Sequence, residues 1–295
     1  MPGGSGVAAG PWFGVGRPHS TWRDERAWRN GTLRAPESTE RLQGEPPTYF
    51  GSPLLTEARV PHLFSTRHFP GVRPWRHPDG PFEAAALARF GQHGLGSPHG
   101  EPVAYLRQVH GAEVVVVEHG GLAGQGDVLV TRQTVLPLAI FTADCLPIIL
   151  YDPVGRRLAL AHAGWRGTVE AVARVAVGAL TRAGGTAKTF LAAIGPSIGP
   201  CCYEVDEPVI DRLAAAFPAA WQQWVTAVGA GKWMLDLWHA NEDQLKAAGL
   251  ESERIDNPRL CTSCRMDLFF SYRRGRGQGR LVAVAAIPGG RGEAC

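Results

Sequence analysis

Two short apolar runs near the middle of the chain dominate the pattern of hydrophobic and polar positions. Residues 148–151 and 158–161 are almost entirely apolar, and the turn-forming sequence DPVG at 152–155 separates them. Runs of this length joined by a Pro/Gly turn predict two neighbouring buried strands. Cys145 lies just before the first strand, and His162 ends the second. Because the start of one strand in a hairpin lies beside the end of the next, we expect these two side chains to share one edge of a sheet.

Short apolar runs and stretches with helical spacing fill the rest of the chain without a regular strand–helix repeat. The pattern predicts strands at 62–67, 104–111, 113–118, 128–131, 137–141, 189–194 and 281–287, and helices at 82–94, 168–182, 207–217 and 239–248. Four consecutive Val residues within 113–118 indicate a buried strand. Thr168 is predicted to cap the helix that follows it. Together these elements predict one α/β domain.

The domain is expected to cover residues 49–290, between two segments without a sustained apolar period. Residues 1–48 are rich in Gly, Pro, Ser and Arg, which predicts a disordered extension. An organellar transit peptide or a start codon placed too far upstream are the alternatives for this segment. Residues 291–295 are predicted to be a loose tail.

Composition and charge narrow the class of protein. The chain has 295 residues, of which 44% are hydrophobic and 19% charged, which is ordinary for a globular protein. The net charge of +3 comes without a Lys-rich run, so nucleic acid is not an expected partner. No apolar run reaches the roughly 18 residues of a membrane span. Six Cys without a dense framework or signal peptide indicate thiols in a reducing compartment, and we expect a cytoplasmic protein.

The chemistry predicted at the hairpin edge depends on a third residue. Cys145 and His162 alone suit zinc binding, nucleophilic catalysis, or simply a buried core. His110 also falls at a predicted strand end and precedes Gly111. Two His and one Cys would give zinc three protein ligands and leave one position for water or substrate, the pattern of a catalytic site. A metal-free Cys145–His162 pair, in which the thiolate attacks a carbonyl, is the competing interpretation.

Basic and acidic residues near this edge supply candidates for substrate binding and proton transfer. A Gly-rich turn that leads into a helix leaves free N–H groups, which predicts an anion site at Gly164 and Gly167. Guanidinium groups at strand ends or Gly turns suit bidentate contact with phosphate, and the candidates are Arg67, Arg166, Arg273 and Arg274. Asp127 and Asp144 are candidates for proton transfer or for orienting a ligand His.

Four further Cys residues form two short pairs. Cys261 and Cys264 make a C-x-x-C sequence, and Cys201 and Cys202 are adjacent. The two pairs are compatible with a second, structural metal site. A C-x-x-C sequence alone has many false positives, so separate buried thiols are the favoured interpretation.

Five motifs in order along residues 50–290 resemble the laccase-domain family. Members have been called multicopper polyphenol oxidases and zinc-dependent purine nucleoside phosphorylases with adenosine deaminase activity. The motifs are QVHG (108–111), TADCLP (142–147), HAGWRG (162–167), IGPSIG (194–199) with YEV (203–205), and CT (261–262) with FSYRR (270–274). The chain departs from the family pattern after Ser-Thr-Arg at 65–67, where HFPG (68–71) replaces Gly-Gly and a Ser.

The resemblance implies a fold, a cofactor and a reaction. It implies a mixed-sheet α/β sandwich of the Cys-His hydrolase-like type, shared with a bacterial toxin's deamidase domain. It implies zinc, with copper as the less favoured metal, at His110, Cys145 and His162. The implied reactions are phosphorolysis of adenosine, inosine and methylthioadenosine, and deamination of adenosine. The partners would then be small molecules, a purine nucleoside and phosphate. The oligomeric state is not predicted.

Three alternative functions remain open at this stage. The first is a metal-free cysteine amidase that edits peptidoglycan precursors, as some relatives are linked to that process. The second is a laccase-like polyphenol oxidase with copper, but such enzymes hold several copper ions through H-x-H pairs. The chain has 10 His and no H-x-H pair, so a single soft site suits zinc or one copper ion. The third is a non-catalytic module with a structural metal.

Overall fold

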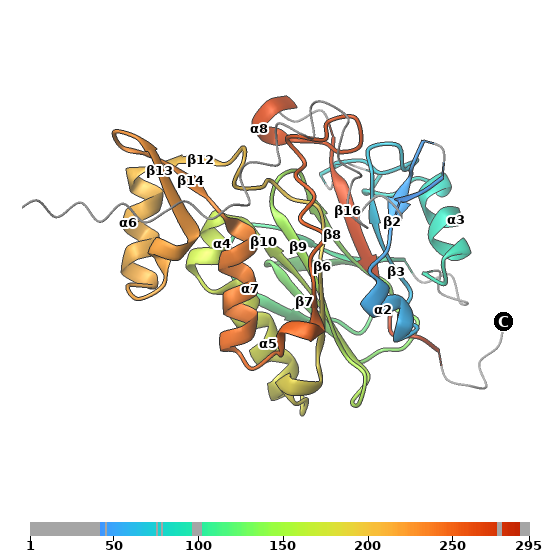
Figure 1. Ribbon diagram of the computed structural model, residues 1–295. Coiled ribbons are helices and arrows are strands. Elements are labelled where there is room, and N and C mark those ends of the chain that lie inside the picture. Colours follow the sequence, from blue (N-terminus) through green and yellow to red (C-terminus); the bar gives the residue numbers. More distant parts are fainter. Residues whose placement is uncertain are drawn as a thin grey trace, which may run out of the picture. The chain divides into compact units, whose positions relative to one another are not determined.

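The computed structural model describes residues 42–44, 46–74, 76–77, 79–95, 102–275 and 279–289 (Figure 1). The predicted tail and most of the predicted extension lie outside these residues and stay predictions. Within the range predicted as an extension, β1 (Leu42–Gln43) pairs antiparallel with β2 (Tyr49–Phe50). Regular structure therefore begins before Tyr49.

Two large sheets carry the fold. The seven-stranded sheet has the order β1-β2-β3-β16-β8-β4-β6, with β3 (His62–Ser65), β16 (Leu281–Ala285), β8 (Leu138–Thr142), β4 (Ala104–Arg107) and β6 (Gly121–Gln125). The six-stranded sheet has the order β15-β11-β9-β10-β7-β5, with β15 (Ile255–Asp256), β11 (Leu191–Ile194), β9 (Leu146–Asp152), β10 (Arg157–Ala163), β7 (Val128–Thr131) and β5 (Val114–Val116). A small third sheet joins β12 (Glu204–Asp206), β14 (Lys232–Leu235) and β13 (Val225–Gly229).

Alternation of side chains along the strands builds the layers. In β7, Leu129 faces the other sheet, whereas Val128 and Val130 pack against helices. The helices on that face are α5 (Val172–Arg182) and α7 (Leu237–Ala247), and α6 (Glu207–Ala216) extends the same apolar cluster beside the small third sheet (Figure 1). Helix α3 (Ala84–Gln92) covers the seven-stranded sheet. Each strand contributes to two apolar layers because successive side chains point to opposite faces. The predicted mixed-sheet α/β sandwich is confirmed, and its likeness to Cys-His hydrolases stays a prediction.

The helix predicted at 168–182 is two helices, so the expected Thr168 cap is wrong. Helix α4 (Trp165–Val169) begins earlier, after Gly164, and Ala171 with φ 58° separates it from α5. Thr168 lies inside α4, and its hydroxyl accepts a hydrogen bond at 3.0 Å from Asn241 of α7. Asn241 is far from Thr168 in the sequence, so no local pattern could indicate this hydrogen bond.

Two strand predictions also need correction. The strand predicted at 104–111 ends at Arg107, so His110 lies in the loop beyond it. The Val-rich strand β5 is not buried on both faces, because it lies at the edge of its sheet and Val116 is 71% exposed.

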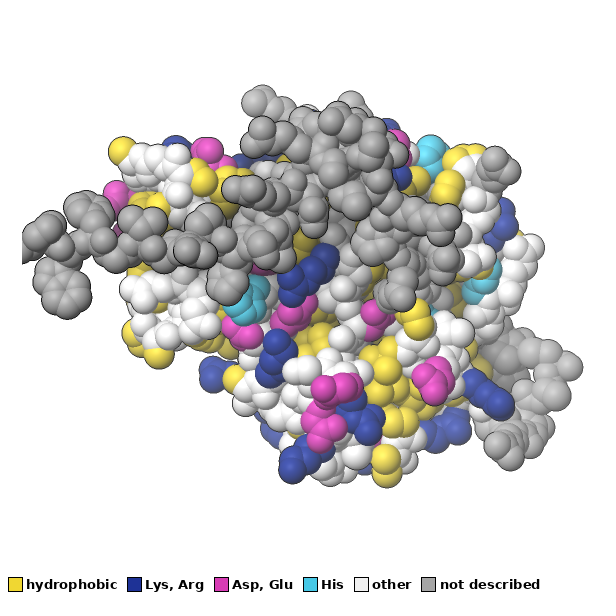
Figure 2. All heavy atoms as spheres, in the orientation of Figure 1, with side chains coloured by type: hydrophobic (Ala, Val, Ile, Leu, Met, Phe, Trp, Pro, Cys, Tyr) yellow, Lys and Arg dark blue, Asp and Glu magenta, His cyan; other side chains and the backbone are white. Residues whose placement is uncertain are grey.

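The surface mixes both signs of charge. On the face that Figure 2 shows, Lys and Arg side chains alternate with Asp and Glu side chains over the parts that are coloured. Among the described residues, no helix combines the length and the apolar character that crossing a membrane requires.

Candidate metal centre and adjoining pocket

The β9–β10 hairpin brings Cys145 and His162 together, as the sequence predicted. His162 is paired with Pro147, so it lies beside the start of β9, which Cys145 precedes. His110 reaches the same place from the loop after β4, and the ligand atoms of these three residues all lie within 4.8 Å of one another. The two imidazole rings are nearly perpendicular, at 77°, with centroids 4.9 Å apart. His162 is buried, Cys145 is half-buried and His110 is exposed, so the group opens to solvent on one side.

Asp127 holds the His162 ring and the backbone of the His110 loop. Its fully buried carboxylate accepts a hydrogen bond at 2.8 Å from Nδ1 of His162, which directs Nε2 toward Cys145. It also accepts from the backbone N–H groups of His110 (3.0 Å) and Gly111 (2.7 Å). His110 has φ 66°, a left-handed conformation that is uncommon outside Gly, and these bonds hold it there.

Gln108 fixes the other side of the same loop. Its side-chain amide donates at 2.8 Å to the backbone oxygen of Phe141 and accepts at 2.8 Å from the Phe141 N–H. The buried Gln108 thus continues the pairing of β4 with β8 by one side chain. The result is a loop that presents His110 without itself being part of a strand.

Opposite charges within the group stabilise each other. Burial raises the pKa of the Cys145 thiol, but the charge of His162 and hydrogen bonds from both imidazoles lower it to about 6. Burial lowers the pKa of His162, but the Cys145 thiolate and Asp127 raise it to about 9. Burial likewise raises the pKa of Asp127, but its bond to His162 brings it below its usual value. A thiolate–imidazolium pair therefore exists at neutral pH when a proton occupies the place a metal would take.

Two glycines let α4 approach these residues. A Cβ at Gly164 would lie 3.0 Å from Sγ of Cys145 and 3.3 Å from Cδ2 of His110. A Cβ at Gly167 would lie 3.0 Å from the backbone oxygen of Gly111. Gly164 thus borders a space that a side chain would fill.

The donor set fits zinc. A tetrahedral zinc ion with bonds of about 2.0–2.3 Å holds nitrogen and sulfur ligands about 3.3–3.6 Å apart, within reach of small side-chain rotations here. His110, Cys145 and His162 would hold the ion, and Asp127 would orient His162 through its other ring nitrogen.

Asp144 directly precedes Cys145 and links this part of the chain to distant segments. Its carboxylate accepts hydrogen bonds from Oγ1 of Thr262 (2.6 Å), Oγ of Ser271 (3.1 Å) and the backbone N–H of Arg273 (2.6 Å). Asp144 is buried and has φ 86°. Its hydrogen bonds hold a strained backbone next to the Cys145 thiol.

A pocket of about 260 Å³ adjoins α4. Its lining residues are Trp165, Tyr203, Glu204, Val205, Asp206, Val209, Lys232 and Arg273. The Arg273 guanidinium lies 5.1 Å from the Tyr203 ring centroid and donates to the backbone oxygen of Glu204. Burial and the nearby Cys145 thiolate raise the pKa of Tyr203, which therefore stays a neutral hydroxyl.

The predicted arginines divide into two groups. Arg166 is exposed and lies 4.6 Å from the Trp165 ring, and Arg273 lines the pocket. Arg67 is elsewhere, because its guanidinium donates to the backbone oxygen of Met266 and covers the Phe270 ring at 5.0 Å. Tyr203 and Lys232 line the pocket but were not predicted from the sequence, although Tyr203 lies within the YEV motif at 203–205.

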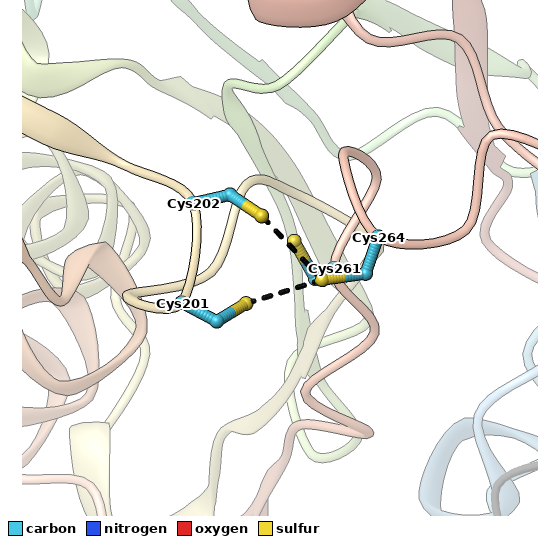
Figure 3. Close-up of side chains that lie close together, drawn as sticks. All are labelled: Cys201, Cys202, Cys261 and Cys264. Atoms are coloured by element: carbon cyan, nitrogen blue, oxygen red, sulfur yellow. Dashed lines mark hydrogen bonds between the residues drawn. The ribbon is translucent and has the colours of Figure 1, made fainter. Parts of the chain in front are cut away.

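The favoured prediction that the two Cys pairs are separate buried thiols is wrong. The Sγ atoms of Cys201, Cys202, Cys261 and Cys264 all lie within 4.8 Å of one another (Figure 3). Cys264 is exposed, and Cys201 and Cys202 are half-buried.

Comparison with known proteins yields one family. The model of the multi-copper polyphenol oxidoreductase laccase family matches residues 83–288 of this chain. Purine nucleoside phosphorylase YlmD from Geobacillus stearothermophilus is 40% identical over 192 residues, which are 60% of this chain and 69% of the relative. The purine nucleoside phosphorylase of Deinococcus radiodurans is 36% identical over 82% of this chain and 96% of its own.

Other relatives add a second activity and a structure. Adenosine deaminase RL5, from an unknown prokaryotic organism, is 36% identical over 57% of this chain and 68% of its own. The crystal structure of YlmD from Geobacillus stearothermophilus superimposes with a TM-score of 0.74 and 31% identity, covering 84% of this chain and 99% of the other.

Proposed function

This chain belongs to the multi-copper polyphenol oxidoreductase laccase family, and we propose that it is a zinc-dependent purine nucleoside enzyme. The proposed reactions are phosphorolysis of adenosine, inosine and methylthioadenosine, and hydrolytic deamination of adenosine. The names of the relatives support this choice, because they include purine nucleoside phosphorylases and an adenosine deaminase. The convergence of His110, Cys145 and His162 within 4.8 Å carries the proposal.

A single site with three protein ligands suits hydrolysis better than oxidation. Zinc held by His110, Cys145 and His162 would leave one position open and would lower the pKa of a water molecule to about 7, which would supply a nucleophile at neutral pH. A multicopper oxidase needs several adjacent copper ions. Among the described residues only two groups of side chains could hold a metal, and they share no residue.

The adjoining pocket supplies contacts for a nucleoside. Trp165 and Tyr203 are aromatic side chains on which a purine ring can stack. We assign phosphate binding to Arg273 and Arg166, with the backbone after Gly164, because both guanidinium groups lie beside these rings. We leave Arg67 outside the phosphate site, because Met266 and Phe270 already occupy its guanidinium.

The two acidic candidates are assigned positioning roles. Asp127 already accepts from His162 and from the backbone of the His110 loop, so it keeps the ring and loop in place. Asp144 already accepts three hydrogen bonds from residues 262–273, so it aligns the backbone before Cys145. Both carboxylates therefore act as hydrogen-bond acceptors in this arrangement.

A second candidate function rests on the charge state of the metal-free site. Cys145 with a pKa of about 6, paired with His162 and Asp127, has the order of groups found in thiol hydrolases. In that case the Cys145 thiolate attacks an amide carbonyl and His162 protonates the leaving amine. A peptidoglycan precursor would be such an amide substrate.

One experiment separates the two. Purified protein is incubated with adenosine, with and without phosphate, and products are identified as inosine, hypoxanthine, adenine and ribose 1-phosphate. The zinc proposal expects purine products that disappear with a chelator and return with added zinc. Amidase activity that persists in chelator, without nucleoside turnover, would establish the thiol hydrolase instead. Cys145→Ala abolishes activity in both cases and serves as the background control.

A further inference from the structure

Two loops far apart in the sequence bring four sulfur atoms together. Cys201 and Cys202 lie between β11 and β12, and Cys261 and Cys264 lie after β15. Figure 3 shows the first pair facing the second across the gap between the loops. Sγ of Cys264 lies 3.4 Å from Sγ of Cys201 and 3.4 Å from Sγ of Cys202. None of these residues belongs to the His110–Cys145–His162 site.

The spacing fits a metal better than it fits disulfides. A tetrahedral zinc ion with four Zn–S bonds of about 2.3 Å holds its sulfurs about 3.8 Å apart. All four sulfurs here lie within 4.8 Å, and the closest contacts are 3.4 Å, so they bracket that value. A disulfide needs about 2.05 Å, and all four residues are free thiols.

The surrounding backbone supports negative charge on the sulfurs. The N–H of Gly199 donates to Sγ of Cys261 at 3.3 Å. Ser197 and Cys261 form a β-bridge, in which Ser197 N–H donates to Leu260 and Thr262 N–H donates to Ser197. N–H groups directed at thiolates are a usual feature of metal–sulfur sites, and the bridge fixes the two loops at the spacing a shared ion requires.

We propose that Cys201, Cys202, Cys261 and Cys264 together bind a zinc ion with a structural role. Four protein ligands fill the coordination of zinc, so no position is left for a substrate. A tetrahedral set of four sulfurs also suits iron, but iron in such a site absorbs visible light and zinc does not, so colour decides between them.

The ion would clamp the walls of the adjoining pocket. Tyr203 follows Cys202 directly, and Arg273 lies on the segment that follows Cys264. Thr262, next to Cys261, donates to Asp144, which precedes Cys145. A structural ion at this point therefore sets the positions of pocket residues from two loops without touching the substrate.

Metal content of the full-length protein, purified under reducing conditions with zinc in the medium, tests the proposal. Cys145→Ala is expected to retain about one zinc ion per chain, with X-ray absorption showing a shell of sulfur alone at about 2.3 Å. Cys264→Ser is expected to lose one ion per chain relative to the wild type. Cys295→Ser is the matched control, because Cys295 is not one of the four proposed ligands, and its removal should leave the zinc content unchanged.

Other outcomes overturn the proposal. A Cys145→Ala protein without bound zinc, a Cys264→Ser protein with full zinc content, or a disulfide within the cluster of the reduced protein would each exclude a structural zinc site. Visible absorption from iron would exclude zinc as the metal. If Cys264→Ser does not fold, the Cys145→Ala measurement decides alone. Failure of the nucleoside proposal is distinguishable, because the all-sulfur shell is measured without any substrate.

Discussion

Replacing Asp127 with Asn removes the buried charge that orients the imidazole of His162, a proposed zinc ligand. One carboxylate oxygen accepts from His162 and from the His110 N–H, and the other accepts from the Val109 and Gly111 N–H groups. In Asp127→Asn, one of these positions becomes an NH₂ group, which faces donors instead of accepting from them. A buried donor left without a partner costs about 1–3 kcal/mol. At about 2–4 °C per kcal/mol for a protein of this size, the melting temperature should fall by roughly 5 °C.

The same substitution should weaken zinc binding. Loss of a residue that orients a metal-bound His lowers metal affinity by about 10–100-fold. Competition with a chromophoric chelator measures this affinity directly. Asp152→Asn is the matched control, because Asp152 is an equally buried carboxylate that pairs with Arg157 away from the site. It should lower the melting temperature and leave zinc affinity unchanged.

The comparison has a clear refuting result. If Asp127→Asn and Asp152→Asn lose similar stability and bind zinc like the wild type, Asp127 supports the fold alone. The proposed orientation of His162 by its Nδ1 bond would then be wrong. A change in zinc affinity without a change in melting temperature would instead show that water satisfies the exposed donors of the His110 loop.

Three further predictions follow from the site. Gly164→Ala should lower zinc affinity at least about tenfold, because its Cβ meets Sγ of Cys145, and chelator competition measures this affinity. Gly178→Ala inside α5 should instead stabilise the protein by about 0.5–1 kcal/mol, which calorimetry measures. The pKa of His162 is about 9, so between pH 6 and 9 zinc must displace a proton from His162. The apparent zinc affinity should therefore rise about tenfold per pH unit over this range. A flat profile would contradict the thiolate–imidazolium pair. Arg273→Ala should raise the KM for phosphate at least about tenfold with little effect on zinc content; an unchanged KM would remove Arg273 from the phosphate site.

Local sequence patterns predicted the positions of the two proposed ligands on the hairpin better than the position of the one outside it. Cys145 and His162 follow from the register of two adjacent strands, which a turn of four residues specifies. His110 was selected as a strand end, yet its strand ends at Arg107. Its placement depends on a carboxylate from Asp127, a contact between segments that no periodicity describes.

The cysteine cluster could be named only as a possibility, for the same physical reason. The sulfurs of Cys201 and Cys264 are 63 positions apart in the sequence, and they meet only because β11 and β15 are parallel neighbours. The apolar pattern indicated β11, but β15 has two residues and no pattern of its own. The sequence therefore made a shared metal site of the two pairs only one possibility, and separate buried thiols remained the favoured interpretation.

Asp144 shows how the two cysteine-containing sites depend on one another. It occupies a left-handed conformation that costs about 1–3 kcal/mol for a non-Gly residue, and it does so one position before Cys145. Hydrogen bonds from Thr262 and Ser271, 118 and 127 positions away, offset this cost. Thr262 itself follows Cys261, so the segment that stabilises Asp144 is the segment that the four cysteines hold. The Cys145 thiol is therefore placed by the strand register and kept in place by a loop that contains two of the four cysteines of the proposed structural zinc site.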